Sequence, residues 1–499
     1  MAEETTAAAA AGSTETTARS GSLLERILSE GRLAREDAES QKHARDLLQE
    51  FIDQTSKGLK IDEKTKDTVR AIEKQVAEID RLISAQLNEI LHSPEYQRLE
   101  ASWRGLHHLV KNTETGNKLK LRLLNITKGE LLKDLESASE FDQSSLFKKV
   151  YEEEYGTFGG HPFGLLIGDY EFDRVATDIS LLGLISNAAA AAHAPFIAAA
   201  SPGLFDMKSF TELGNPRDLA KIFESTELIP WTSFRESEDS RYVALTLPHV
   251  MMRLPYGPKT VPIEEFHFDE EVDGTDHSKY LWGNAAYFLG QRITNAFAKY
   301  GWCAAIRGLE GGGQVEGLPS HTFKTAAGET IQKCPTEVAI TDRRENELNN
   351  LGFISLVHCK STDYAVFFGG QTTQKPAIYD LPEATANARL SAMLPYMLAA
   401  SRFAHYLKAI CRDKIGSFMT AENLSLYLNR WIGNYVLARD DAGQDLKASS
   451  PLRSARVDVK DVAGRPGAYK AVVFLRPHFQ LEELTTSIRL VASLPPPAA

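Results

Sequence analysis

The sequence has 499 residues, of which 43% are hydrophobic and 25% are charged, and its formal net charge at pH 7 is −11. A chain of this length usually forms about two to four domains. The negative charge argues against a main partner that is nucleic acid or an anionic membrane, because both would repel it. The four cysteines are widely spaced, which predicts reduced thiols in a cytoplasmic protein and neither a disulfide framework nor a zinc site.

The N-terminal residues 1–21 are rich in Ala, Thr, Ser and Glu and predict a disordered leader that lacks the basic and apolar parts of a signal peptide. Ser22 and Glu25 then form a capping box that starts a short helix. This helix either docks on its own domain or binds a partner as a peptide in a groove. Its apolar face consists of Leu23, Leu24, Ile27 and Leu28.

Residues 61–91 predict a long amphipathic helix. Apolar side chains recur along it at spacings of 3 and 4, which is the pattern of a narrow seam between two helices. The seam could pack on the core of this chain or against a helix of a second protein. Its members are Val69, Ile72, Val76, Ile79 and Ile83.

From residue 119 the pattern changes to that of a mixed α/β fold. Residues 118–127 alternate like a strand, 161–170 read as a buried strand, 178–194 as a helix and 195–201 as another strand. This order predicts β-α-β units in a mainly α/β core. Further along, we expect a helix within 280–302, strands at 336–340, 351–360 and 363–370, and three helical stretches between residues 382 and 438.

The C-terminal part of the chain turns to β-structure. Residues 454–462 and 469–477 flank the turn sequence AGRPGA and predict a hairpin. Val457 and Val459 would lie on one of its faces, and Val472 and Phe474 on the other. Such a hairpin can be offered to neighbouring chains, or it can complete the sheet of its own chain.

Two glycine-rich segments were tested as phosphate loops. The segment EYGTFGGHPFGLLIGDYEF (154–172) contains neither a G-x-G-x-x-G fingerprint nor the Gly-Lys-Ser/Thr of a P-loop. In the second segment, 307–319, Gln314 stands where a P-loop requires lysine. We therefore interpret 154–172 as scaffold, in which Gly159 and Gly160 let the backbone turn, residues 165–167 build the core and Asp169 anchors the following segment.

The acidic segment 267–277 resembles a metal site at first sight, because it combines His267, His277 and several carboxylates. It fails as an EF-hand, since Tyr280 occupies the position of the bidentate glutamate. A solvated acidic loop is the favoured interpretation, and a cytosolic α/β enzyme with a divalent metal at this loop is kept as a rival. No nucleophile elbow or other catalytic set is found, so we expect neither enzymatic activity nor a cofactor or metal.

Several long segments, taken in order, carry a family resemblance. They are residues 95–110, 154–172, 280–323, 341–371 and 388–416. Together they closely resemble the large subunit of the contractile sheath of type VI secretion, the TssC/VipB family. The resemblance extends from residue 22 to about residue 494. It implies a core similar to phage tail sheath proteins, with N-terminal helices and C-terminal β-strands that exchange with neighbouring protomers.

The resemblance also implies a set of partners. The protein would pair with a small sheath subunit of the TssB/VipA family, and the heterodimers would stack as six-membered rings into a helical sheath. That sheath would surround an inner tube protein, start on a baseplate, eject the tube by contraction and be disassembled by an AAA+ unfoldase. No nucleic acid and no membrane insertion are expected. A phage-type sheath made of one component is a second rival.

The family's organisation maps onto the chain as six regions. In the family, the N-terminal helix of the large subunit is recognised by the unfoldase, and Leu23, Leu24, Ile27 and Leu28 match that position. The seam from Val69 to Ile83 is assigned to packing near the small subunit. The regions are a leader (1–21), an unfoldase-recognition region (22–60), a helical region near the small subunit (61–118), an α/β core (119–380), its helical part (381–440) and a β-strand linker (441–499).

Overall fold

The computed structural model describes residues 38–57, 65–138, 140–215, 218–264, 266–325, 327–439, 441–465, 467–478 and 480. They fall into two compact units, each of which is described on its own. The first unit comprises Met1–Glu89 and Pro262–Asp269, and the second comprises Ile90–Val261 and Glu270–Ala499.

The described residues of the first unit form helices α2 (Ala38–Lys57) and α3 (Thr65–Leu91). The last two residues of α3 belong to the second unit. Helix α3 confirms the helix predicted for residues 61–91. Its sequence contains neither Gly nor Pro, and apolar residues follow a 3.6-residue period on one face. The capping box at Ser22 lies outside the described residues.

A six-stranded sheet organises the second unit, with the order β1-β2-β3-β9-β10-β6. Neighbouring strands from β1 to β9 run parallel, whereas β10 is antiparallel to both β9 and β6. The β-α-β order that the sequence predicts is thereby confirmed. The strands are β1 (Leu166–Phe172), β2 (Phe196–Ala200), β3 (Val243–Leu247), β9 (Phe353–His358), β10 (Ala365–Phe367) and β6 (Gln314–Val315).

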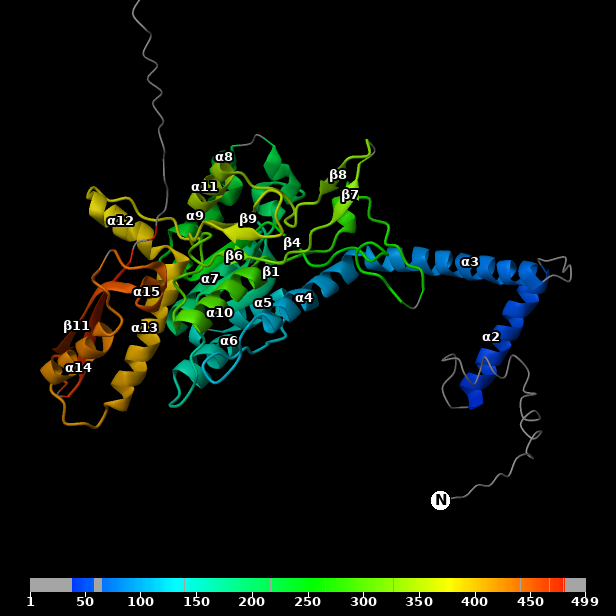
Figure 1. Ribbon diagram of the computed structural model, residues 1–499. Helices are drawn as coiled ribbons and strands as arrows, with labels where there is room; N and C mark the ends of the chain where they lie inside the picture. The colour runs from blue at the N-terminus through cyan, green and yellow to red at the C-terminus, as the bar shows by residue number, and fades with distance from the viewer. Residues whose placement is uncertain are drawn as a thin grey trace, which may run out of the picture. The chain divides into compact units, whose positions relative to one another are not determined.

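Both faces of the sheet are buried, because alternate residues of each strand enter different hydrophobic clusters. Phe196 and Ala198 of β2 face a cluster with residues of α7 (Ala176–Ala192), while Ile197 between them faces a cluster with residues of α10 (Ala286–Tyr300). Helices α7 and α10 therefore cover opposite faces of the sheet (Figure 1). This double burial explains why β2 and β3 read as continuous apolar runs.

Further helices and short strands complete the second unit. The α-helices are α4 (Pro94–Lys111), α5 (Lys128–Ser137), α6 (Ser145–Phe147), α8 (Leu219–Phe223), α9 (Ile229–Glu236), α11 (Asp342–Asn350), α12 (Pro382–Ser391), α13 (Leu394–Asp413), α14 (Ala421–Gly433) and α15 (Gln444–Ser449). A π-helix covers Lys148–Tyr155. The strands β4 (Val250–Met251) and β5 (Trp282–Gly283) form one antiparallel pair, and β7 (Thr322–Lys324) and β8 (Thr330–Gln332) form another.

The predicted C-terminal hairpin is present as β11 (Leu452–Asp461) and β12 (Tyr469–Pro477), an antiparallel pair separate from the central sheet. Helix α14 lies against β11, beside α13 (Figure 1). Phe403, Leu428 and Val457 are buried in the cluster that joins these elements. Leu424 and Leu428 of α14 are buried in the same cluster, and Trp431 packs against it.

Two predicted strands are absent from the described part of the chain. Residues 119–127 are extended but pair with no strand, and Leu123 is 69% exposed. Residues 336–340 contain only an isolated bridge between Thr336 and Val250. The strand predictions for these two segments are wrong. Alternation of apolar residues indicates extended backbone, but a strand also requires a ladder of hydrogen bonds to a neighbour, and residues 336–340 have only the single bridge to Val250.

The segment 154–172 is scaffold, as predicted. Gly159 has φ +75°, and a Cβ at Gly160 would collide with the backbone of Glu154, so both positions require glycine. Leu165 and Ile167 pack against the cluster that contains α10. The expectation for Asp169 is wrong: its carboxylate contacts the Tyr287 hydroxyl on α10, and a different carboxylate, that of Asp178, accepts the hydrogen bond from Asp173 N at 2.9 Å.

Candidate interaction surfaces

The face of α3 that was predicted to contact a second subunit is uncovered by the described residues. Val76, Ile79 and Ile83 are 46%, 41% and 42% exposed. Val69 and Ile72 lie within the span of the same helix, but their side chains are outside the description. An apolar stripe of this kind on a helix is typical of a surface that packs against another helix. The other predicted surface, at Leu23, Leu24, Ile27 and Leu28, lies outside the described residues.

Helix α4 carries an apolar stripe that the sequence analysis missed. Its buried face includes Gly105, where a Cβ would collide with the ring of Tyr287. On the opposite face, Trp103 is 63% exposed, which is unusual for so large an apolar side chain. The signal was present in the sequence as spacings of 3 and 4. The exposed members are Tyr96, Leu99, Trp103 and Val110.

The two faces of the C-terminal hairpin differ as predicted. Val457 is fully buried and Val459 packs partly against the same cluster under the hairpin. Val472 and Phe474 lie on the outer face and are 40% and 49% exposed. The hairpin is therefore attached to its own chain by one face, while the other face presents apolar side chains to solvent.

The two edges of the hairpin also differ. The amide of Asn429 on α14 donates to the Val457 carbonyl at 2.7 Å, and its oxygen accepts from the Val457 amide at 2.9 Å, so the middle of the β11 edge is occupied. Residues 470–476 of β12 make no backbone hydrogen bond to any other described strand than β11. Among the described strands β12 pairs with β11 alone, so its other edge can accept a further strand.

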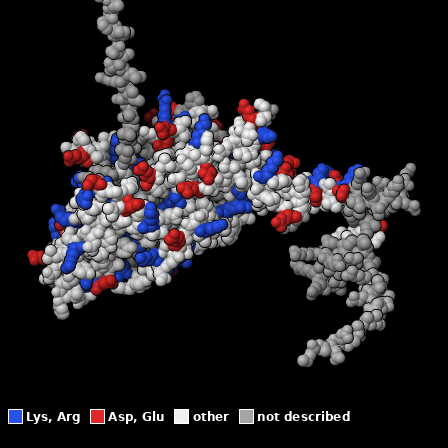
Figure 2. Space-filling model, in the orientation of Figure 1, with Lys and Arg blue, Asp and Glu red and all other residues white. Residues whose placement is uncertain are grey.

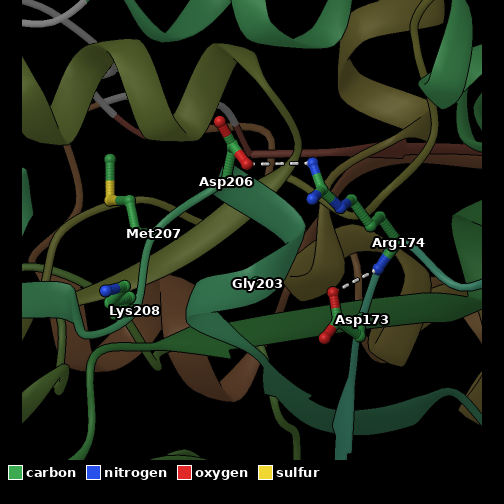
Figure 3. Close-up of a pocket in the computed structure, with 6 residues that line it drawn as sticks. All are labelled: Asp173, Arg174, Gly203, Asp206, Met207 and Lys208. Carbon is green, nitrogen blue, oxygen red and sulfur yellow. Dashed lines mark hydrogen bonds and ion pairs between the residues drawn. The ribbon is translucent and has the colours of Figure 1, made fainter.

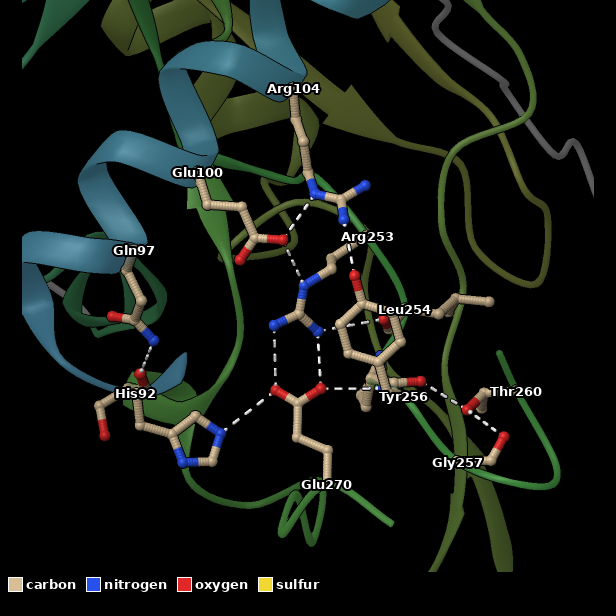
Figure 4. Close-up of polar contacts among 12 residues, drawn as sticks. His92, Gln97, Glu100, Arg104, Arg253, Leu254, Tyr256, Gly257, Thr260 and Glu270 are labelled. Carbon is tan, nitrogen blue, oxygen red and sulfur yellow. Dashed lines mark hydrogen bonds and ion pairs between the residues drawn. The ribbon is translucent and has the colours of Figure 1, made fainter. Parts of the chain in front are cut away.

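A buried ionic cluster fixes α4 to the segment that follows β4 (Figure 4). The Glu270 side chain is 1% exposed and accepts from Arg253 Nη1 at 2.6 Å, from Arg253 Nη2 at 3.2 Å and from the Tyr256 amide at 2.8 Å. His92 Nε2 lies 3.2 Å from Glu270 Oε1. Glu100 of α4 accepts from Arg253 Nε at 2.9 Å. Burial would lower the pKa of Arg253, but its bonds to Glu270 and Glu100 raise it.

A second buried charge cluster lies at the carboxyl ends of the parallel strands. His249, which follows β3, places Nε2 2.9 Å from Glu171 Oε1 and Nδ1 2.6 Å from Glu337 Oε2. Burial alone would lower the pKa of His249, but hydrogen bonds from its ring to the two carboxylates raise it to about 10. We refer to these three residues as the histidine triad. Its ion pairs connect the segment after β3 with β1 and with Glu337, and none of its three residues is a free nucleophile.

The pocket shown in Figure 3 has a volume of about 320 Å³ and lies where β1 and β2 end. Three of its four charged residues, Asp173, Arg174 and Asp206, contact one another. Arg174 Nη1 lies 3.1 Å from Asp206 Oδ1 and 3.5 Å from Glu227 Oε2, and the Arg174 amide donates to Asp173 at 2.6 Å. The carboxylates of Asp173 and Asp206 are thus engaged with Arg174.

The glycine-rich segment 307–319 is not a phosphate cradle. The Gly308 amide donates to the Phe367 carbonyl at 2.7 Å, and the Gly313 amide donates to the Gly308 carbonyl at 2.9 Å. These amides hold the segment beside β10 and are not available to a phosphate. The structure therefore agrees with the sequence-based rejection of a P-loop.

The acidic loop around residues 267–277 is held by hydrogen bonds among its own residues. The Asp273 carboxylate accepts from the Thr275 amide at 2.9 Å and from the Asp276 amide at 3.1 Å, and these bonds lower the pKa of Asp273 to about 2. His277 Nε2 lies 3.1 Å from Lys333 Nζ, a cation that would repel a metal ion. Across the described ranges, no group of three or more His, Cys, Asp or Glu side chains could hold a metal.

Charge and hydropathy agree with these assignments. On the face of the second unit visible in Figure 2, Lys, Arg, Asp and Glu are interspersed. Such mixing differs from the single-sign field expected of a nucleic-acid interface. Within the helices that the structure describes, none has the length and apolar character needed to cross a membrane.

Comparisons with known proteins give the family. Two family models match: the EvpB/VC_A0108 tail sheath N-terminal domain (VipB) over residues 73–374, and the EvpB/VC_A0108 tail sheath gpW/gp25-like domain over residues 383–494. A relative from Pseudomonas aeruginosa, the type VI secretion system sheath protein TssC1, is 51% identical over 501 residues, covering 99% of each chain.

Two solved structures show more distant likenesses. The anti-feeding prophage baseplate contains a chain that is 10% identical with a TM-score of 0.38, covering 75% of this chain and 84% of that one. The contracted helical sheath of the same particle is 12% identical with a TM-score of 0.31, covering 62% and 66%. The family models and the P. aeruginosa relative alone carry the assignment: the chain belongs to the VipB/TssC family of type VI secretion sheath proteins.

Proposed function

We propose that this chain is the large subunit of a two-component contractile sheath in the bacterial cytoplasm. It pairs with a small sheath subunit, and the pairs stack as six-membered rings into a helical tubule that surrounds an inner tube and starts on a baseplate. The observation that carries the proposal is the relative named a type VI secretion system sheath protein, which is 51% identical along the whole chain.

The role is mechanical, and the chain is not an enzyme. Support comes from the polar groups that a catalytic site would need, which are engaged in holding the fold together. Arg174 of the pocket pairs with Asp206, the Gly308 and Gly313 amides donate to backbone carbonyls, and Asp273 accepts from an amide of its own loop. A sheath subunit has to resist and transmit force, and internally satisfied charges suit that task.

The seam of α3 binds the small subunit. Val76, Ile79 and Ile83 present an apolar stripe at helical spacing, which fits a helix of the partner. The stripe on α4 with Trp103 at its centre offers a second apolar surface for subunit packing, since exposed Trp side chains often anchor interfaces.

The edge of β12 links protomers by accepting a strand from a neighbour. Val457 and Val459 hold the hairpin to its own chain, while Val472 and Phe474 pack on the incoming protomer. Main-chain hydrogen bonds make such links strong and directional. They would persist while subunits rotate as rigid bodies during contraction, which ejects the inner tube. An AAA+ unfoldase then recycles the sheath by gripping Leu23, Leu24, Ile27 and Leu28.

Negative-stain electron microscopy of the chain, alone and co-expressed with its small partner, tests the proposal. Long tubules only in the co-expressed sample are expected. Tubules from the chain alone would instead indicate a one-component sheath of the phage type. Small uniform particles in both samples would overturn the sheath proposal, and a metal that co-purifies with them would favour the rival enzyme.

The unfoldase surface is tested by the double variant Leu24→Asp/Ile27→Asp. Burying carboxylates in an apolar groove is unfavourable, so pull-down of the unfoldase should be lost while tubules still form. Leu446→Asp is the control, because Leu446 is an exposed leucine of α15 outside the recognition region 22–60. Unchanged pull-down by the double variant would refute the assignment.

The small-subunit surface is tested by Ile79→Glu/Ile83→Glu on α3. The variant should co-purify with much less small subunit, since two carboxylates would enter an apolar seam. Ala77→Glu/Ala85→Glu adds the same charge at other exposed positions of the helix and should leave pairing intact. Equal recovery of the small subunit with both variants would contradict the role of the seam.

A further inference from the structure

Residues 119–126, which precede α5, have backbone groups that the described chain leaves almost unpaired. The run contains no helix, turn or bend. Its backbone accepts two hydrogen bonds, one at Leu119 O from the Gly116 amide at 2.9 Å and one at Ile126 O from the Tyr170 hydroxyl at 2.7 Å. The other N–H and C=O groups of these residues bond to no described residue. We refer to residues 119–126 as the unpaired segment.

The unpaired segment is held in place at several points. Leu121 packs against the cluster that contains α10, and Ile126 packs against the cluster that contains α7. These clusters lie on opposite faces of the sheet, so the segment crosses the sheet at the edge formed by β1, the strand of Tyr170. The Arg122 guanidinium pairs with the Glu154 carboxylate. A backbone that is already straight and anchored loses little conformational entropy when a strand is added to it.

Two leucines in the middle of the unpaired segment are exposed. Leu123 is 69% exposed and Leu124 is 47% exposed. Adjacent side chains of an extended backbone point to opposite sides, so apolar surface is exposed on both sides of the segment. Apolar side chains beside free backbone groups are what a sheet edge presents to an incoming strand.

The charges of the segment define what kind of strand fits it. The sequence KLKLRL at residues 118–123 alternates basic residues with leucines, so its cations share one side of an extended backbone. Lys118 and Lys120 are exposed, whereas Arg122 pairs within the chain. Opposite charges across paired strands are favourable and like charges are unfavourable. The complementary strand therefore carries acidic residues on this side and apolar residues on the other.

The complementary strand comes from a different protein. The open edge of β12 in this chain carries Lys470 and Arg476 and no acidic residue. If the β12 edge of a second copy met the unpaired segment, cations would lie opposite cations. An acidic strand of another protein avoids this repulsion.

We propose that the unpaired segment is a further binding site for the small sheath subunit, which adds to it a β-strand of alternating acidic and apolar residues. Main-chain hydrogen bonds supply the strength of such an addition, and the alternation of charges and leucines fixes its register. The inference rests on the proposed two-component sheath and assigns a site and a chemistry of binding other than the seam of α3.

Hydrogen exchange and cross-linking of the full chain co-purified with its small partner test the proposal. Peptides that cover the unpaired segment should exchange at least about 100-fold more slowly in the complex than after denaturation, because strand pairing protects their amides. A carbodiimide, which joins amines directly to carboxylates, should link Lys118 or Lys120 to an acidic residue of the small subunit. Exchange at the denatured rate, or no cross-link from these lysines to the small subunit, overturns the proposal.

Charge reversals make the test specific. Lys118→Glu/Lys120→Glu places carboxylates opposite the acidic strand and should raise exchange of the segment in the complex about tenfold, since two cross-strand pairs become repulsive. Lys324→Glu/Lys360→Glu makes the same change in charge at exposed positions elsewhere and should leave this exchange unaltered. Equal exchange in the two variants contradicts the proposal. If the first variant fails to fold, exchange and cross-linking of the unaltered complex decide.

Failure of this inference is distinguishable from failure of the proposed function. A complex that forms tubules while the unpaired segment exchanges at the denatured rate overturns the inference and leaves the two-component sheath standing. A chain that forms no complex with the small subunit overturns both.

Discussion

The ionic cluster of Figure 4 makes the strongest prediction about stability, through the substitution Arg253→Met. Methionine keeps much of the volume of the arginine stem but removes its charge and donors. Glu270 would then keep only His92 and the Tyr256 amide as partners, although its side chain is 1% exposed. The variant therefore leaves a carboxylate buried without its main counter-charge.

Breaking a buried pair from one side costs about 3–5 kcal/mol. We expect Arg253→Met to fall within this range, because Arg253 makes two bonds to Glu270 and one to Glu100, and its guanidinium lies 4.6 Å from the centre of the Tyr256 ring. The double variant Arg253→Met/Glu270→Met removes both charges and should be destabilised by less than Arg253→Met alone, because no unpaired carboxylate remains buried.

Native-state hydrogen exchange of peptides that contain Tyr256 is the assay, because its amide donates to Glu270. A loss of 3–5 kcal/mol corresponds to a rise in exchange on the order of 10²- to 10³-fold. Lys375→Met is the control. It breaks the exposed pair with Glu236, which is worth about 0–1 kcal/mol, and should leave these peptides unchanged.

Two outcomes would refute this reasoning. Exchange of the Tyr256 peptides in Arg253→Met that matches the control would mean that the cluster does not stabilise its surroundings. A double variant that exchanges faster than Arg253→Met would mean that the buried carboxylate is not the source of the cost.

Two further predictions concern the histidine triad and the hairpin. The pKa of His249, about 10, lies above its ordinary value of 6.5, so the stability that it contributes is full below about pH 6.5 and is lost as the pH rises through 10. His249→Gln should therefore flatten the fall in melting temperature between pH 7 and 10, and an unchanged slope would contradict this. Asn429→Leu leaves the buried backbone groups of Val457 without partners and should destabilise the hairpin by about 1–3 kcal/mol, seen as faster exchange of β11 peptides but not of β2 peptides.

The sequence was informative where local pattern and tertiary structure coincide. The helix at residues 65–91, the β-α-β order and the hairpin follow from periodicity. In the sheet and the hairpin the residues that set the period also meet the core, whereas those of α3 are exposed. Residues 119–127 show the limit: alternation predicts extended backbone there, yet pairing depends on a neighbouring strand that local pattern cannot supply.

Of the features on the candidate surfaces, some could be predicted from the sequence and others could not. The stripe centred on Trp103 was readable from its spacing, but its exposure depends on which face of α4 meets Tyr287 and the rest of the core. The ionic cluster was not readable, because Glu100, Arg253 and Glu270 are far apart in the sequence and become neighbours only through the fold. Charged residues that are distant in sequence carry no local sign that they will be buried together.

The contact between Asn429 and Val457 determines at which edge the hairpin can add a further strand. A two-stranded sheet with both edges free could stack indefinitely, as strands do in amyloid fibres. The Asn429 side chain bonds to the backbone N–H and C=O of Val457 at the centre of the β11 edge. Among the described strands, β12 pairs with β11 alone and can accept one further strand. Asn429 thus closes the centre of the β11 edge and restricts strand addition to the β12 side.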